Sequence, residues 1–77
     1  MPKITPLPSE KLVKIFELAG FVVTRRHGDH IVMTKAGINR PLVIKASGKE
    51  VPVFHIRTNL TTAKMSRERY FELLERI

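Results

Sequence analysis

The chain has 77 residues, which predicts one small domain without room for a second hydrophobic core. Fourteen lysines and arginines against seven acidic residues give a formal net charge of +7, which favours an anionic partner, most commonly nucleic acid. The absence of cysteine excludes disulfides and thiolate chemistry and fits a cytoplasmic protein, and no apolar run has the ~20 residues of a membrane span.

The first predicted helix follows a lead-in stiffened by prolines. Residues 1–8 form this lead-in, and residues 9–77 are expected to form a single domain. Ser9 is predicted to cap the helix, because its hydroxyl can accept from the free N–H groups of the first turn. Gly20 is expected to end the helix in a left-handed conformation. One apolar stripe recurs at helical spacing: Leu12, Ile15, Phe16 and Ala19.

A β-hairpin is predicted next. Two short apolar runs favour strands over residues 21–26 and 30–35. A turn at Gly28 and Asp29 would connect them. The connecting stretch concentrates charge: Arg25, Arg26, His27, Gly28, Asp29 and His30.

Two registers of this hairpin are compatible with the sequence. A two-residue loop would pair His27 with His30, and a three-residue loop would pair Arg26 with His30. A one-residue slip inverts every side chain, so the register with the cleaner separation of faces is favoured. That register is the three-residue loop, which puts four apolar side chains on one face: Phe21, Val23, Ile31 and Met33. His30 is therefore predicted to point away from the core.

The second half of the chain predicts one strand and two helices. A strand over residues 41–45 is followed by a polar loop over residues 46–50. A helix should begin near Pro52, which suits a first turn. Ser66 is predicted to cap a last helix over residues 67–76. The apolar positions of the two helices are Val53, Ile56, Leu60, Ala63, Tyr70, Phe71, Leu74 and Ile77.

The element order α-β-β-β-α-α indicates an α+β fold. One three-stranded antiparallel sheet with the helices packed on one face satisfies both the amphipathic helices and the two-sided strands. The free face of the sheet is then expected to carry Thr24, Arg26, His30, Thr34 and Lys45.

The residue types favour metal-free RNA chemistry over metal catalysis. The acidic residues are scattered, and no pair of histidines has the spacing of a metal-binding helix. RNA supplies its own nucleophile, the 2′-hydroxyl, so cleavage needs only a base, an acid and cations. Histidine can act as either acid or base near neutral pH. The alternative is that the histidines of the predicted hairpin, His27 and His30, are surface residues or phosphate contacts.

Residues 12–23 read LVKIFELAGFVV, and residues 25–33 read RRHGDHIVM. These segments resemble the HicA (YcfA-like) toxins of bacterial and archaeal toxin–antitoxin systems, in which a helix ends in AGF and a Gly-Ser-His motif opens the next strand. The likeness continues in four later segments, residues 42–44, 49–52, 56–60 and 65–74. It thus covers residues 9–74.

This resemblance implies a fold like a double-stranded-RNA-binding domain with an extra C-terminal helix. It also implies a ribosome-independent mRNA interferase without a cofactor, held in check by a HicB-like antitoxin. The family's catalytic histidine corresponds to His30. The remaining basic residues of the hairpin and the following loop are candidate RNA contacts: Arg25, Arg26, His27, Lys45 and Lys49.

The chain departs from the family pattern beside this histidine. Asp29 stands where the family has serine, and its carboxylate can orient the imidazole of His30 while repelling phosphate. Two other functions fit the same residues, a non-catalytic RNA-binding domain of this fold and a basic protein-interaction module.

Overall fold

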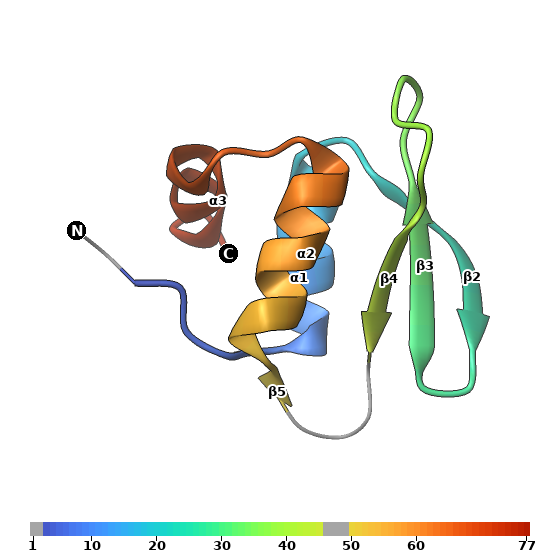
Figure 1. Ribbon diagram of the computed structural model, residues 1–77, viewed down its shortest axis with the longest axis horizontal. Coiled ribbons are helices and arrows are strands. Elements are labelled where there is room, and N and C mark those ends of the chain that lie inside the picture. Colours follow the sequence, from blue (N-terminus) through green and yellow to red (C-terminus); the bar gives the residue numbers. More distant parts are fainter. Residues whose placement is uncertain (1–2, 46–49) are drawn as a thin grey trace.

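One antiparallel sheet with helices on a single side makes up most of the protein, as the sequence predicts (Figure 1). The computed structural model describes residues 3–45 and 50–77. The elements in chain order are β1 (Leu7–Pro8), α1 (Ser9–Leu18), β2 (Val22–His27), β3 (His30–Thr34), β4 (Leu42–Lys45), β5 (Glu50–Val51), α2 (Val53–Ala63) and α3 (Arg67–Leu74).

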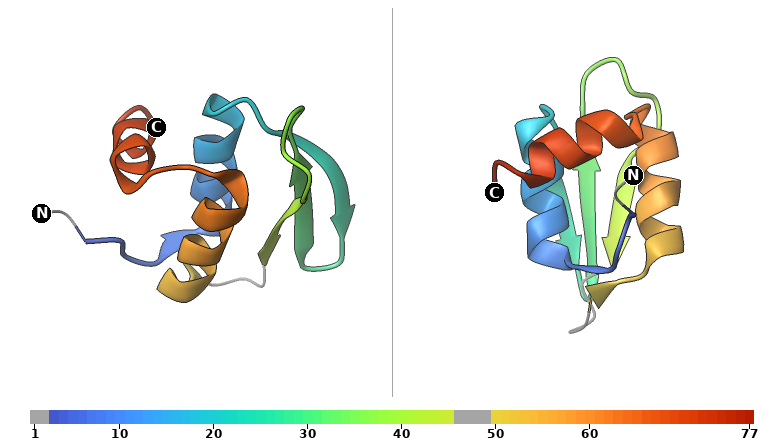
Figure 2. Two further views of the ribbon diagram at one scale, coloured as in Figure 1. Left: turned by 45° about the horizontal axis from the view of Figure 1, so that its top comes forward. Right: turned by 90° about the vertical axis from the view of Figure 1, so that its left-hand side faces the viewer.

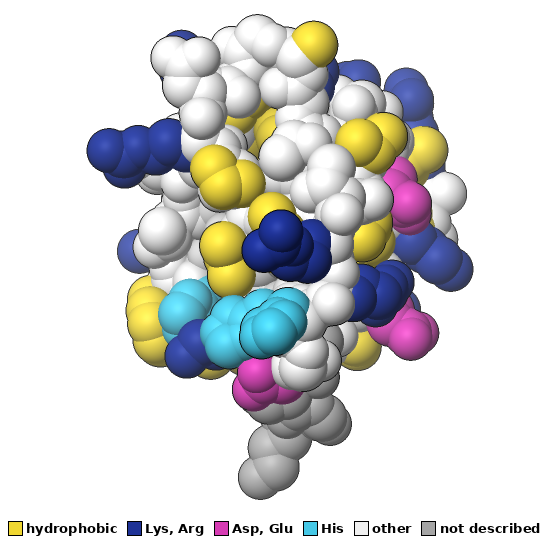
Figure 3. Space-filling view, turned by 90° about the vertical axis from the view of Figure 1, so that its right-hand side faces the viewer, with side chains coloured by type: hydrophobic (Ala, Val, Ile, Leu, Met, Phe, Trp, Pro, Cys, Tyr) yellow, Lys and Arg dark blue, Asp and Glu magenta, His cyan; other side chains and the backbone are white. Residues whose placement is uncertain are grey.

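The described elements form three layers. The sheet has the strand order β2-β3-β4, α1 and α2 pack on one face of it, and α3 packs on α1 from the side away from the sheet (Figure 1). Figure 2 shows α1 lying over the β2 side and α2 over the β4 side. The opposite face of the sheet is open to solvent in the described part of the chain (Figure 3). We call it the open face.

The core lies between the sheet and the helices, where the predicted apolar stripes meet. Side chains exposed by no more than 2% include Leu12, Ile15, Phe16, Ile31, Met33, Leu42, Ile44, Ile56, Tyr70 and Leu73. Leu73 was not among the predicted core positions, whereas Ile77, which was, is 42% exposed. Because α3 ends at Leu74, Ile77 falls beyond the helix that was expected to bury it.

The hairpin register is half as predicted. Away from the turn, Val23 pairs with Met33, as in the favoured register. Near the turn the prediction is wrong, because His27 rather than Arg26 pairs with His30 across a two-residue loop. The register shifts between Val23 and Arg25, so a β-bulge accommodates one extra residue in β2.

This bulge changes which basic residues reach the open face. Paired residues point to the same side of a sheet, and Arg26 pairs with the buried Ile31. Arg26 is therefore on the helix side, not on the open face as predicted. Arg25 takes the place on the open face that was expected for Arg26. Arg25 pairs with Val32, which lies between the buried Ile31 and Met33 and therefore points to the open face. His30 lies on the open face, as predicted, since it alternates with buried residues along β3.

The helix boundaries are close to those expected. Ser9 was predicted as a cap but is the first helical residue, because Pro8 occupies the cap position after pairing with Glu50 in a two-stranded sheet of β1 and β5. Pro52 likewise precedes α2 as its cap residue. Gly20 follows α1 with a φ of +101°, as predicted.

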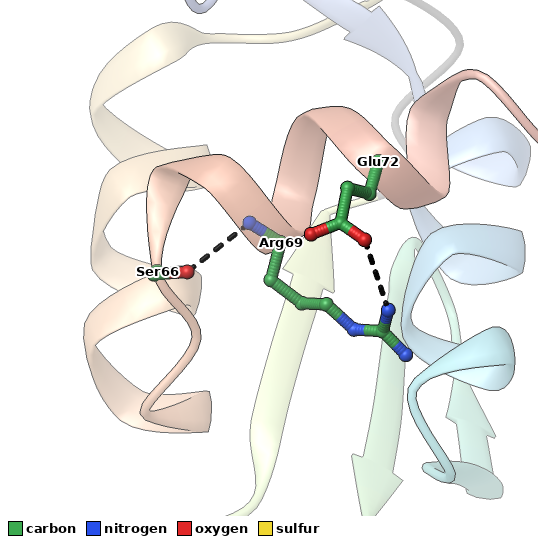
Figure 4. Close-up of polar contacts among 3 residues, drawn as sticks. All are labelled: Ser66, Arg69 and Glu72. Carbon is green, nitrogen blue, oxygen red and sulfur yellow. Dashed lines mark hydrogen bonds and ion pairs between the residues drawn. The ribbon is translucent and has the colours of Figure 1, made fainter.

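Ser66 caps α3, as the sequence predicts. Its Oγ accepts from the backbone N–H of Arg69 at 3.1 Å, and Nη1 of Arg69 lies 3.5 Å from Oε2 of Glu72 (Figure 4). This cap stabilises the start of α3, the helix that forms the third layer.

The small β1–β5 sheet was not predicted. It joins the start of the chain to the segment before α2 through the pairing of Leu7 with Val51. Ile4 packs into the core and is 7% exposed. Glu50, expected in the polar loop, is in β5, and the rest of that loop, residues 46–49, lies outside the described residues.

Candidate active site

A row of basic side chains crosses the open face at the end of the sheet nearest the hairpin turn. His30 is the first residue of β3 and pairs with His27 on β2 and with Lys45 on β4. Cross-strand pairs have Cβ atoms about 4.5–5.5 Å apart, so the three side chains are neighbours. In Figure 3 the histidine side chains (cyan) form a band low on this face, bordered by lysine and arginine.

Asp29 orients His30. Oδ1 of Asp29 lies 2.9 Å from Nδ1 of His30, and the two side chains are 54% and 42% exposed. An exposed pair of this kind contributes only about 0–1 kcal/mol to stability. Its effect is on the imidazole, because a carboxylate beside Nδ1 favours a proton on that nitrogen. Nε2 is then the nitrogen that can take up a proton.

The turn that holds this pair has a simple cause in the sequence. Gly28 has a φ of +61°, a left-handed conformation that L side chains rarely adopt. Together with Asp29 it forms the two-residue loop between β2 and β3. The tight loop places His27 and His30 directly opposite each other.

A groove of about 340 Å³ adjoins His30 on the β4 side of the sheet. Strand β4 and its preceding segment form one wall, and α2 forms the other. The lining residues are His30, Arg40, Pro41, Val43, Lys45, His55, Thr58, Asn59 and Thr62. We call this the β4–α2 groove. Among these described lining residues there are two permanent cations and no carboxylate.

Sequence reasoning missed the wall contributed by α2. Its polar residues recur at helical spacing beside the apolar stripe, at positions 55, 58, 59 and 62, so the signal was present. A polar stripe of this kind usually faces solvent, and the sequence does not show that it lies along the edge strand. Arg40 was missed as well, since it precedes the strand predicted over residues 41–45 and belongs to no predicted element.

Asn59 is the most buried polar residue of the groove. It is 5% exposed, and its Nδ2 has no hydrogen-bond partner among the described residues. Burying an amide without a partner costs about 1–3 kcal/mol, so this position is not optimised for stability.

The predicted catalytic and RNA-binding residues fall into four groups. His30 and Lys45 line the groove. Arg25 and His27 lie on the open face beside it, and Arg26 lies on the other side of the sheet. Lys49 falls outside the described residues.

Among residues 3–45 and 50–77, no three histidine, cysteine, aspartate or glutamate side chains come together as a metal ion would require. In the same part of the chain, no helix has both the length and the apolar character needed to cross a membrane.

Comparison with known proteins places the chain in a family. No curated protein matches the sequence. A family model described as the HicA toxin of bacterial toxin–antitoxin systems matches residues 9–65, which include α1, the whole three-stranded sheet and α2. The match thus spans most of the 77 residues and both walls of the β4–α2 groove, and the chain belongs to the HicA toxin family.

Proposed function

We propose that this protein is the toxin of a type II toxin–antitoxin system and acts as a metal-independent RNA endonuclease, an mRNA interferase, with His30 as general acid/base. The observation that carries the proposal is the position of His30. Its imidazole lies on the open face, is oriented by Asp29, and borders a groove lined by cations. RNA is the anionic substrate that needs only these groups for cleavage.

The reaction begins with the 2′-hydroxyl of the substrate. A base removes its proton, the 2′-oxygen attacks the adjacent phosphorus, and the bond to the 5′-oxygen breaks. Negative charge builds up on the phosphate during this step. Lys45 and Arg40, which line the groove with His30, can compensate that charge. DNA lacks the 2′-hydroxyl and is not cleaved by this route.

The RNA backbone is held by charge rather than by base recognition. Arg25 and His27 extend the basic surface from the groove across the open face. Contacts of this kind are made mainly to phosphates, so binding weakens as salt rises. We expect binding to depend more on RNA shape than on sequence.

A HicB-like antitoxin is the proposed protein partner. A partner that blocks cleavage has to cover His30 and the groove beside it. Because two cations and no carboxylate line the described part of that groove, an acidic surface would complement it.

The test compares purified wild-type protein with His30→Ala on end-labelled RNA, with and without EDTA. His30 is part-exposed, so the variant is expected to fold and to bind RNA. It should lose both cleavage and growth inhibition, while wild-type cleavage persists in EDTA. Lys14→Ala is a suitable control, because Lys14 is an exposed cation on α1, in the layer behind the sheet.

Three results would contradict the proposal in different ways. Undiminished cleavage by His30→Ala would remove His30 from the mechanism. Salt-dependent RNA binding without cleavage would make the protein a non-catalytic RNA-binding domain. Negligible RNA affinity at physiological salt would favour a basic module that docks an acidic protein.

A further inference from the structure

A second histidine lies in the same groove as His30. His55 is in the first turn of α2 and lines the β4–α2 groove from the wall facing β4, whereas His30 lines it from the sheet. Figure 3 shows the histidine side chains gathered on one face of the molecule. The two residues are 25 positions apart in the sequence, so only the packing of α2 on β4 brings them to one groove.

The fold holds His55 in this place. Residues on the inner side of α2 anchor the helix on the core, since Ile56 is fully buried and Leu60 is 5% exposed. The ring of His55 also lies against the exposed ring of Phe54 in a tilted contact, with centroids 4.3 Å apart and an interplanar angle of 33°. His55 itself remains part-exposed and accessible from the groove.

The contact with Asp29 suggests how the two histidines divide the work. With a proton favoured on Nδ1, His30 presents Nε2 as a base. Cleavage then needs a separate acid for the leaving oxygen. Among the described residues lining the groove, the other charged or titratable groups are Arg40, Lys45 and His55. Arginine and lysine hold their protons far above neutral pH and are poor donors there, whereas an imidazolium is a good one.

We infer that His55 is the general acid of the reaction and His30 its general base, an assignment that rests on the ribonuclease function proposed above. His30 takes the proton of the 2′-hydroxyl, and the 2′-oxygen bonds to phosphorus. As the P–O5′ bond breaks, the imidazolium of His55 gives its proton to the 5′-oxygen. The products are a 2′,3′-cyclic phosphate and a 5′-hydroxyl. His30 is left protonated and His55 neutral, and exchange with water restores both.

A substrate with sulfur in place of the bridging 5′-oxygen separates the two roles. A thiolate leaves without receiving a proton, so the acid becomes dispensable while the base does not. On ordinary RNA, His55→Gln should lower kcat by about 10²–10⁴-fold. On the sulfur substrate the same variant should cleave at a rate close to wild type. His30→Gln should be impaired on both.

The pH profile gives an independent readout. A general acid acts in its protonated form, so wild-type kcat on ordinary RNA should fall at alkaline pH, and His55→Gln should lose this dependence. His30, Arg40 and Lys45 are the described charged or titratable groups that share the groove with His55. His27→Gln is a matched control, since His27 neighbours His30 but does not line the groove. It should raise KM and keep the pH profile of kcat.

The rates on the two substrates decide whether His55 is the general acid. Equal loss of kcat by His55→Gln on both substrates, or no loss on either, would overturn the role of His55 while leaving His30 as the catalytic base. Absence of cleavage by the wild-type protein on both substrates would overturn the proposed function and this assignment with it.

Discussion

Lys45 lies directly opposite His30 in the β3–β4 pair, and both side chains line the β4–α2 groove. This pairing sets a permanent positive charge beside the imidazole at cross-strand distance. A phosphate held at His30 is therefore within reach of a cation that the sheet itself positions.

Lys45→Ala should slow RNA cleavage and weaken RNA binding. Removing a cation that acts on charge developing in the transition state should lower kcat by about 10²-fold. Loss of one phosphate contact should also reduce the salt slope of RNA binding by about 0.7. Lys45→Arg should keep most of the activity because it keeps the charge. The measurements are single-turnover rates and binding at several salt concentrations, with Lys14→Ala on α1 as a control for net charge. A Lys45→Ala protein with unchanged kcat would show that the charge acts on binding alone.

Replacing Gly28 or Gly20 by alanine should destabilise the protein to different extents. Gly28 has a φ of +61° and nothing within 4 Å of an added Cβ, so Gly28→Ala should cost only the left-handed conformation, about 1–2 kcal/mol. Gly20 has a φ of +101°, and an added Cβ would lie 3.2 Å from Cε of Lys35, whose Nζ donates to the carbonyl of Ala19. Gly20→Ala should therefore lower the free energy of unfolding by more. Urea titrations of both variants measure the difference, and equal losses would contradict it.

The burial of Tyr70 leads us to expect that the protein loses stability at high pH. Its side chain is buried and its hydroxyl has no hydrogen-bond partner among the described residues, and burial raises its pKa from 10.0 to about 12. The unfolded chain ionises first, so the contribution of Tyr70 is fully present below pH 10 and is lost as pH rises toward 12. A pKa shift of this size corresponds to a loss of roughly 2–3 kcal/mol from the free energy of unfolding.

Tyr70→Phe tests this expectation. The variant removes an unpaired buried hydroxyl and should match or exceed wild-type stability at pH 8, by up to about 1 kcal/mol. It should also lose the decline between pH 10 and 12. Parallel thermal unfolding curves across this pH range provide the measurement. A decline of the same size in both proteins would assign it to other groups.

The alternation of apolar residues explains why the sheet and the position of His30 could be predicted. Ile31 and Met33 have to face the core, so His30 has to face away from it. The register at the turn could not be predicted in the same way. The bulge beside Thr24 lets Val23 keep its apolar partner while the turn adopts a two-residue loop, and no periodicity reveals such an insertion.

The far wall of the groove depends on packing that the sequence does not show. Whether His55 faces solvent or the sheet edge is decided by how α2 lies on β4, which follows from side-chain fit between the two elements. The pairing of β1 with β5 is hidden for another reason. Each strand has two residues, too few for a pattern.

Asp29 should have opposite effects on binding and on chemistry. Its carboxylate lies 2.9 Å from Nδ1 of His30 and on the same exposed turn, where it also repels a phosphate. Asp29→Ala should therefore bind RNA more tightly while lowering kcat, because the imidazole loses the group that orients it. We expect a roughly 10-fold loss of kcat, below that of removing a catalytic group outright.

Asp29→Ser and Asp29→Asn separate the two effects. Serine is the residue of the family's motif, and both side chains offer an oxygen to Nδ1 without a negative charge. They should bind RNA as tightly as Asp29→Ala but keep more of the wild-type kcat. Because the pair is exposed, all three variants should lie within about 1 kcal/mol of wild-type stability. Weaker RNA binding by all three would mean that the carboxylate holds the turn in its binding conformation, and that repulsion of phosphate is the smaller effect.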